Sequence, residues 1–240
     1  HTINGKNMNF SVVLPAKNEA ATVAVVAAAI KEQFPEAEII VVNDGSTDET
    51  GLLAKSAGAI VINHPYSKGN GASIKAGARA ATGNVIVFMD ADGQHDPKDI
   101  SSLLALIDEG YDLVVGARQS GSQASVGRGL ANGLYNKLAT YMTGHKVEDL
   151  TSGFRAVRAE KFKEFLYLLP NGFSYPTTST MAFFRAGYSV KYVPIHAAQR
   201  EGKSHIKPLK DGMRFLLIIF KVATLYSPLK LFTPAAAFFF

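Results

Sequence analysis

The chain has 240 residues and a formal net charge of +5. This length suits one large domain, alone or with a short appendage, and it can bury a sizeable core without covalent cross-links. The sequence contains no cysteine, which excludes disulfides and thiolate metal sites. From Arg200 onward there are seven Lys or Arg against two acidic residues, so residues 1–199 are neutral overall. The basic excess predicts an anionic surface or substrate near the C-terminal end. The Leu-, Ile- and Phe-rich composition there argues against nucleic acid as the partner.

Apolar strands and helical segments alternate along the first half of the chain. The expected strands are short, mainly apolar runs at 10–14, 38–42, 59–62, 85–89 and 112–115. The expected helices lie at about 20–34, after Ser46 or Thr47, from 68–71 onward, and from Asp96-Pro97 to 107. Because strands and helices alternate every 20–30 residues or so, roughly the length of βα units, we expect an α/β fold with a mostly parallel sheet and helices on both faces.

Polar segments follow the expected strands directly, at 15–19, 43–48, 68–71 and 90–96. The carboxyl ends of parallel strands meet at one edge, and open α/β sheets bind their ligands there. None of these segments contains Gly-x-Gly-x-x-Gly or Gly-x-x-x-x-Gly-Lys-Ser/Thr. Neither dinucleotide binding nor P-loop phosphate binding is therefore indicated.

The segment after the apolar run 85–89 contains Asp90, Asp92 and Gln94. A strand buried on both faces would deliver the two carboxylates to the sheet edge, and they would share one face if the strand continued that far. Two carboxylates at this spacing repel each other unless a hard divalent cation lies near them. Mg²⁺ or Mn²⁺ held in this way keeps waters and takes phosphate oxygens from a substrate. A solvated surface loop is the alternative interpretation of an Asp-x-Asp pair.

Beyond residue 116 the alternation is less regular. We expect helices at about 130–143 and 161–169, a hydroxyl-rich run at 175–180, and a strand at 190–195. Within the intervening polar segment, Asp149 is interpreted either as an acceptor-side residue or as a partner that holds Arg155, and we favour the second. His95 is expected to pack or to form a hydrogen bond rather than to bind a metal.

The C-terminal segment has a helical pattern over 208–226. On a helical wheel, four cations fall within about 60° of one another and the remaining circumference is apolar; they are Lys207, Lys210, Arg214 and Lys221. This pattern favours a helix lying on an anionic membrane surface, with a core helix whose Lys221 reaches solvent as the alternative. The apolar stretch 229–240 is shorter than the roughly 20 residues that span a bilayer, and we interpret it as the possible beginning of a transmembrane helix.

Six segments, in this order, resemble family 2 glycosyltransferases of GT-A fold; they are Pro15–Glu19, Val42–Asp48, Asp90–His95, Gly116–Arg118, Asp149–Arg155 and Arg200–Ser204. The last two narrow the resemblance to the branch that glycosylates dolichyl or polyprenyl phosphate. The similarity covers about residues 10–210. It implies a tail at 1–9, a catalytic domain at 10–206 and an interfacial segment at 207–240. It also implies an enzyme at the cytoplasmic face of a membrane, peripheral or anchored by its C-terminal helices.

The resemblance implies inverting transfer of a sugar from a nucleotide-diphosphate sugar to a polyprenyl phosphate. The positions that match nucleotide-binding residues of the family are Pro15, Ala16, Asn18, Glu19, Asp44, Gly69, Gly71 and Asp90. Those that match its metal and diphosphate site are Asp90, Asp92 and Gln94. The acceptor phosphate would bind at Arg118, Arg128 and Ser152, and the loop carrying Arg200 and Lys203 would close over the diphosphate. Asp92, Arg118 and Arg128 are the expected catalytic residues.

Two departures from the family pattern concern specificity. The run 175–180 has hydroxyl groups where many relatives carry acidic residues, and His205 stands where a Lys is usual. Two alternatives also stay open. A glycan or other hydroxyl acceptor would need a general base, for which Asp149 is the obvious candidate. A domain that binds a nucleotide sugar and docks to a membrane without catalysis is the other.

Overall fold

A computed structural model describes residues 9–118, 126–172 and 174–195, together with residues 2, 3, 6 and 7 and eight single positions between 217 and 236. Of residues 126–132 it describes the backbone alone. Arg200, Lys203 and the basic stripe of the tail lie outside these residues, as does the side chain of Arg128. The described positions Leu217, Phe220 and Thr224 are helical.

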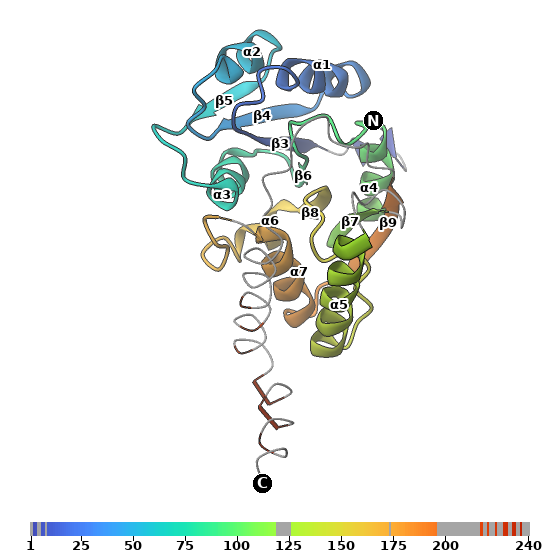
Figure 1. Ribbon diagram of the computed structural model, residues 1–240. Coiled ribbons are helices and arrows are strands. Elements are labelled where there is room, and N and C mark those ends of the chain that lie inside the picture. The colour runs from blue at the N-terminus through green and yellow to red at the C-terminus, as the bar shows by residue number, and fades with distance from the viewer. Residues whose placement is uncertain are drawn as a thin grey trace.

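The core of the molecule is one seven-stranded sheet with the strand order β5-β4-β3-β6-β8-β7-β9 (Figure 1). Its strands are β3 (Phe10–Ala16), β4 (Glu38–Asn43), β5 (Ile60–Asn63), β6 (Val85–Phe88), β7 (Leu113–Arg118), β8 (Arg155–Arg158) and β9 (Val190–Ile195). Strands β5, β4, β3 and β6 run parallel, as do β7 and β9, whereas β8 is antiparallel to both of its neighbours. The predicted mostly parallel α/β sheet is thus confirmed. The antiparallel β8 and a two-residue pair near the N-terminus, β1 (Thr2–Ile3) with β2 (Lys6–Asn7), were not expected.

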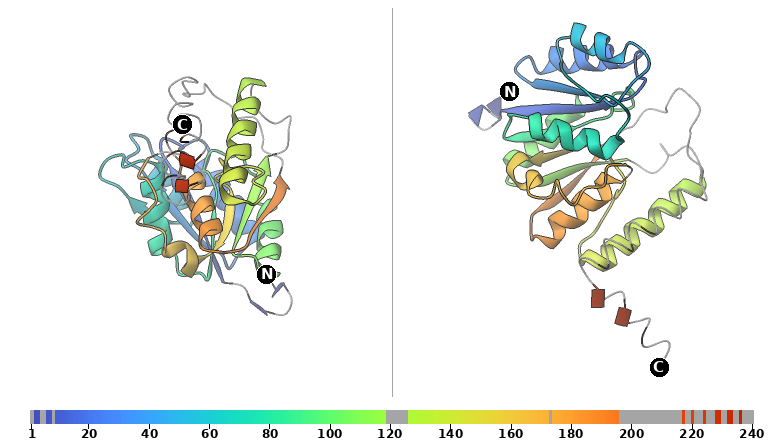
Figure 2. Two further views of the ribbon diagram at one scale, coloured as in Figure 1. Left: turned by 90° about the horizontal axis from the view of Figure 1, so that it is seen from below. Right: turned by 90° about the vertical axis from the view of Figure 1, so that its left-hand side faces the viewer.

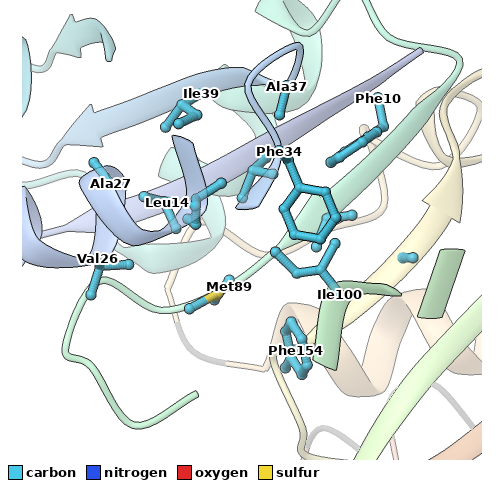
Figure 3. Close-up of a cluster of buried hydrophobic side chains, with 14 of the residues drawn as sticks. Phe10, Leu14, Val26, Ala27, Phe34, Ala37, Ile39, Met89, Ile100 and Phe154 are labelled. Carbon is cyan, nitrogen blue, oxygen red and sulfur yellow. The ribbon is translucent and has the colours of Figure 1, made fainter. Parts of the chain in front are cut away.

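Helices cover both faces of the sheet, as predicted. They are α1 (Val23–Gln33), α2 (Thr50–Ser56), α3 (Asn70–Ala80), α4 (Asp99–Asp108), α5 (Val126–Thr143), α6 (Ala159–Lys163) and α7 (Tyr175–Arg185). Helices α1, α2 and α4 pack on one face, in a cluster that includes Val87. Figure 3 shows Leu14 of β3 in this cluster, near Val26 and Ala27 of α1. Helices α3, α6 and α7 pack on the other, against Val13 and Phe88. This alternation along β3 shows why its apolar run is continuous: a strand covered on both faces has no solvent side.

Helix α5 is positioned differently from the rest. It extends beyond the sheet and packs beside α7, as both views of Figure 2 show. A small separate core joins them, in which Tyr135, Ala139 and Met142 of α5 meet Met181 of α7. Tyr141, by contrast, is 56% exposed.

Several predicted boundaries differ from the structure for local reasons. Strand β6 ends at Phe88, so Asp90 and Asp92 lie in a turn and not on one face of a strand. Helix α4 begins at Asp99 because Asp96 first closes a turn, in which its carboxylate accepts the Lys98 N–H. The helix predicted at 161–169 is shorter than expected, because α6 ends at Lys163. The hydroxyl-rich run 175–180 forms the buried first turns of α7.

The register of the parallel strands sets where the site lies. Val13 pairs with Ile40 of β4 and with Phe88 of β6, so the three strands end at one edge of the sheet. The polar segments that follow them therefore meet there, as predicted. Within the described part of the chain, no helix has both the length and the apolar character needed to cross a membrane.

Candidate active site

The polar segments at the sheet edge enclose a cleft of about 440 Å³. It is lined by Pro15, Ala16, Lys17, Glu19, Asp44, Ser67, Gly69, Asn70, Ser73, Asp90, Ala91 and Asp92. Residues from all four predicted segments contribute. Of the residues predicted to bind nucleotide or metal, Asn18, Gly71 and Gln94 do not belong to this lining.

Asp44, at the end of β4, is buried and accepts four hydrogen bonds from the segment after β5. One carboxylate oxygen accepts hydrogen bonds from Nδ1 of the His64 ring and from the Lys68 N–H, both at 2.8 Å. The other receives the Ser67 hydroxyl at 2.8 Å and the Gly69 N–H at 2.9 Å. Burial alone would raise the pKa of Asp44, but these bonds favour the charged form and lower the pKa to about 2. Asp44 therefore fixes the wall of the cleft as well as lining it.

Asn18 and Glu19 join the first two polar segments. Asn18 has a positive φ of 56°, and its side chain accepts the Thr47 N–H at 2.9 Å. The backbone N–H of Asn18 donates to the Ser46 hydroxyl, and that of Glu19 to the Thr50 hydroxyl. The segment after β3 is thus held against the segment after β4, which fixes one side of the cleft.

Gly69 and Gly71 allow a close approach of two backbones. Gly69 has φ of 101°, and a side chain there would lie 2.6 Å from the carbonyl of Asn171. A side chain at Gly71 would clash with the carbonyl of Pro170. The Gly71 N–H itself donates to the carbonyl of Gly172. The structure thus explains both glycines by packing of α3 against residues 170–172, while their approach to a nucleotide stays a prediction.

Asp90 and Asp92 are half-buried and both face the cleft. The Gln94 N–H donates to Asp92 Oδ1 at 3.1 Å, and the Thr22 hydroxyl donates to the carbonyl of Ala91 at 2.7 Å. These bonds fix the turn that carries the two carboxylates. His95 stacks on Phe154 with ring centroids 5.0 Å apart, and burial lowers its pKa, so it packs as predicted.

The donor set fits a hard divalent cation. Carboxylate oxygens are the ligands that Mg²⁺ and Mn²⁺ prefer, and two of them leave coordination positions for water and phosphate. In the described part of the chain no cluster of three or more Asp, Glu, His or Cys side chains could enclose a metal completely. This arrangement therefore suits a cation shared with a phosphorylated ligand rather than a closed structural site.

Arg118, the last residue of β7, is paired with Asp149 through two hydrogen bonds. Its Nε and Nη2 lie 2.9 and 3.0 Å from the two carboxylate oxygens, and Nη2 also reaches the Thr151 hydroxyl at 2.5 Å. Burial would raise the pKa of Asp149, but the guanidinium keeps it below its usual range. Burial would lower the pKa of Arg118, but its hydrogen bond to Asp149 and the charges of Asp149 and Asp90 raise it. The interpretation that Asp149 holds Arg155 is wrong, because its oxygens bind Arg118.

Ser152 lies under the surface of the predicted acceptor site. Its side chain is buried, and its hydroxyl has no hydrogen-bond partner among the described residues. A phosphate could reach this hydroxyl only after a local rearrangement. Gly153, the next residue, lies directly against Asp90.

Two buried residues contact this segment, Arg155, to which sequence reasoning gave the wrong partner, and Tyr175, which it missed. Arg155 is fully buried and donates to the carbonyls of Ser152 and Pro176. Tyr175, the first residue of α7, donates to the carbonyl of Gly153 at 2.8 Å. Arg155 belongs to a recognised segment, but Tyr175 is 22 residues from Gly153 and carried no signal for this contact.

The family model "Glycosyl transferase family 2" matches residues 11–166. The chain belongs to glycosyl transferase family 2. The family predicted from the sequence is confirmed, and the chain is an enzyme of the glycosyltransferase class.

Two relatives are similar along most of their length. A polyprenol monophosphomannose synthase of Mycolicibacterium smegmatis is 31% identical over 228 residues, which cover 88% of this chain and 84% of the relative. A dolichyl-phosphate hexose transferase of Haloferax volcanii is 29% identical over 216 residues, covering 89% and 93%. These names belong to the predicted branch of the family.

Solved structures confirm the fold class. Glucosyl-3-phosphoglycerate synthase of Mycobacterium tuberculosis, in complex with Mn²⁺ and UDP-glucose, superposes with a TM-score of 0.70 at 25% identity, covering 90% of this chain and 79% of that one. The same enzyme with Mg²⁺ and UDP gives a TM-score of 0.69 at 25% identity, covering 88% and 79%. That enzyme thus binds a divalent cation together with a uridine nucleotide or nucleotide sugar.

Proposed function

We propose that this glycosyltransferase moves a sugar from a nucleotide-diphosphate sugar to a polyprenyl phosphate, with inversion at the anomeric carbon. The observation that carries the proposal is that a pair of carboxylates and an arginine lie at the same edge of the sheet. Asp90 and Asp92 face a cleft for the donor. Arg118, at the end of β7 and held by Asp149, would form the acceptor side, and the charge of Asp90 acts on it. The names of the two relatives support a polyprenyl-type acceptor.

On the donor side, the residues proposed to bind the nucleotide sugar divide into two groups. Residues near Asp44 would hold the nucleoside, while Asp90, Asp92 and Gln94 would hold Mg²⁺ or Mn²⁺ and orient the diphosphate. The bound cation would supply positive charge to the departing diphosphate. Arg200 and Lys203, which lie outside the described residues, would add to that neutralisation.

On the acceptor side, the ionisation and hydrogen bonds of Asp149 distinguish a hydroxyl acceptor from a lipid-phosphate acceptor. A hydroxyl acceptor needs a general base whose pKa lies near the working pH. Asp149 is a poor base, because its pKa is lowered and both oxygens accept bonds from Arg118. A lipid phosphate is already anionic and needs only to be positioned, which a guanidinium does through charge-assisted, bidentate contacts. The geometry of Asp149 therefore favours the phosphate acceptor. Arg118 and Arg128 would bind this phosphate, and Ser152 would join them after a local rearrangement.

The C-terminal segment would keep the enzyme at the membrane in which such a lipid resides. Described apolar residues of this segment are exposed, among them Leu217 at 60% and Leu229 at 78%. Together with the basic stripe of the sequence, they suit an anionic lipid surface. We propose a location at the cytoplasmic face of the membrane, where nucleotide sugars are available.

A partition assay tests this function. Radiolabelled UDP-, GDP- or dTDP-sugars are incubated with the protein, Mn²⁺ and polyprenyl phosphate, and the products are extracted into organic solvent. Label in the organic phase that depends on the lipid supports the proposal. Label confined to water-soluble products would exclude the lipid acceptor, and donor binding without any transfer would favour the non-catalytic module. A thermal-shift series with the same nucleotides identifies the base, because a ligand that prefers the folded state raises Tm.

A further inference from the structure

The backbone at Ser152 and Gly153 is held from behind by two buried side chains. The Tyr175 hydroxyl donates to the carbonyl of Gly153 at 2.8 Å, and the Arg155 guanidinium donates to the carbonyl of Ser152. Tyr175 is 2% exposed and Arg155 is 0% exposed. Two successive carbonyls are therefore fixed by groups that solvent does not reach.

The front of the same segment faces Asp90. A methyl group placed on Gly153 would lie 3.6 and 3.8 Å from the two carboxylate oxygens of Asp90, and 3.5 Å from the Tyr175 hydroxyl. The Asp90 carboxylate and the Tyr175 hydroxyl therefore both lie close to Gly153.

Arg155 is unusual because its acceptors in the described part of the chain are all neutral. Besides the Ser152 carbonyl, they are the Pro176 carbonyl at 3.1 Å and the hydroxyls of Ser179 at 2.9 Å and Thr180 at 3.1 Å. The guanidinium also lies 5.6 Å from the centre of the Tyr175 ring. A buried cation is costly, and an apolar side chain of similar size often gives equal or greater stability. Arg155 thus connects the start of β8 to the first turns of α7 and, through the Ser152 carbonyl, to the segment before β8, which points to positioning rather than to stability.

We propose that Tyr175, supported by Arg155, is a positioning residue that fixes the Ser152–Gly153 backbone against Asp90 and so sets the divalent-cation affinity of the donor cleft. The proposal rests on the proposed role of Asp90 as a metal ligand. It gives the hydroxyl-rich start of α7 a function: its hydroxyls replace a carboxylate as the acceptors of Arg155, so that this side of the cleft gains no further negative charge.

Substitution of Tyr175 by Phe tests the proposal with little risk to the fold, because the ring and its packing are kept. Mn²⁺ binding is measured by the EPR signal of the free ion, with UDP and, separately, GDP present. Loss of a residue that orients a metal ligand typically weakens metal binding 10–100-fold. Because Tyr175 acts on Asp90 only through the Ser152–Gly153 backbone, we expect Mn²⁺ binding to weaken about tenfold. Tm should fall by no more than about 3 °C, the effect of one lost hydrogen bond in a chain of this size. Nucleotide binding without metal should not change.

Two further variants make the outcome decisive. Tyr188→Phe is the matched control, since the Tyr188 hydroxyl bonds Glu164 away from the cleft, and it should bind Mn²⁺ like the parent. Asp90→Asn should lose most Mn²⁺ binding. If Asp90→Asn loses binding and Tyr175→Phe matches the parent, the positioning role is wrong and the proposed function stands. If Asp90→Asn binds Mn²⁺ normally, the metal assignment itself fails, and the inference fails with it.

Discussion

The two sides of the cleft are built in different ways from similar groups. On the donor side, Asp44 follows β4 directly and is held by backbone N–H groups and short side chains of the next connection. On the acceptor side, Arg118 at the end of β7 is held by Asp149, which is 31 residues away in the sequence. Both carboxylates are buried and have lowered pKa values, but one stabilises a loop and the other orients a cation.

Because their partners differ, Asp44 and Asp149 should contribute to different properties of the enzyme. The partners of Asp44 are two backbone N–H groups, a serine hydroxyl and the His64 ring, and all of them belong to the wall of the cleft. Loss of Asp44 should therefore act on the order and stability of that wall. The partner of Asp149 is a charged side chain that faces the other substrate. Its loss should therefore act on acceptor binding and leave the donor cleft intact. Three substitutions test whether the donor and acceptor sides act independently. One of them, at a proposed metal ligand, provides the reference for a near-complete loss of turnover.

The largest effect is expected from Asp92→Asn, which removes a proposed metal ligand from the donor side. Metal ions contribute several kcal/mol to stabilising transition-state charge, so turnover should fall by about 10³-fold or more. The measurement is the initial rate of sugar transfer, with far-UV circular dichroism to show that the fold is intact. Asp96→Asn, in the same loop but exposed, is the control and should be active. Unchanged turnover in Asp92→Asn would contradict the metal assignment.

Asp149→Asn addresses the acceptor side. Arg118 would lose its bidentate partner, and a misplacement of about 1 Å can cost 10²-fold, so kcat/KM for polyprenyl phosphate should fall by about that factor. The loss should appear mainly in the acceptor KM, with the donor KM unchanged. A general base would behave otherwise: kcat itself would collapse and the pH–rate profile would lose its acidic limb.

Glu148→Gln is the matched control for Asp149→Asn. Glu148 is the adjacent acidic residue, and its partner Lys146 is 82% exposed, so this ion pair contributes little. It should leave both KM values near those of the parent. A donor KM that rises with Asp149→Asn as strongly as the acceptor KM would show that the two sides are not independent.

The same difference explains how far the sequence could predict the molecule. The donor side follows from short-range patterns: each parallel strand ends in a polar segment, and parallel register brings those ends together. Asp44, Asp90 and Asp92 could therefore be placed on one edge without any structure. The prediction failed in detail where β6 ended two residues before Asp90, because strand length is not determined by the apolar run alone.

The acceptor side could not be assembled in this way. The antiparallel β8 enters between β6 and β7, and this insertion brings the segment before it, with Asp149, beside Arg118. No periodicity distinguishes Arg118 from Arg155 as the partner of Asp149, and the wrong one was favoured. The start of α7 was also missed as a helix, since Pro176 and four β-branched or small hydroxyl residues give it low helix propensity. Burial of the whole turn against Arg155 overrides that propensity.

The smallest of the three effects is expected for Asp44→Asn, and it should appear in the pH dependence of stability. The pKa of Asp44 is about 2 in the folded protein against 3.8 ordinarily, so its ionised form stabilises the fold above about pH 4 and this contribution is lost as pH falls towards 2. The shift corresponds to about 2 kcal/mol. In urea unfolding followed by far-UV circular dichroism, Asp44→Asn should be less stable than the parent by about that amount at pH 7 and equal to it near pH 2. Glu49→Gln, which changes an exposed carboxylate, should keep the parent's pH dependence. An Asp44→Asn difference that stayed constant with pH would mean that Asp44 contributes packing rather than charge, and that the wall of the donor cleft does not depend on its ionisation.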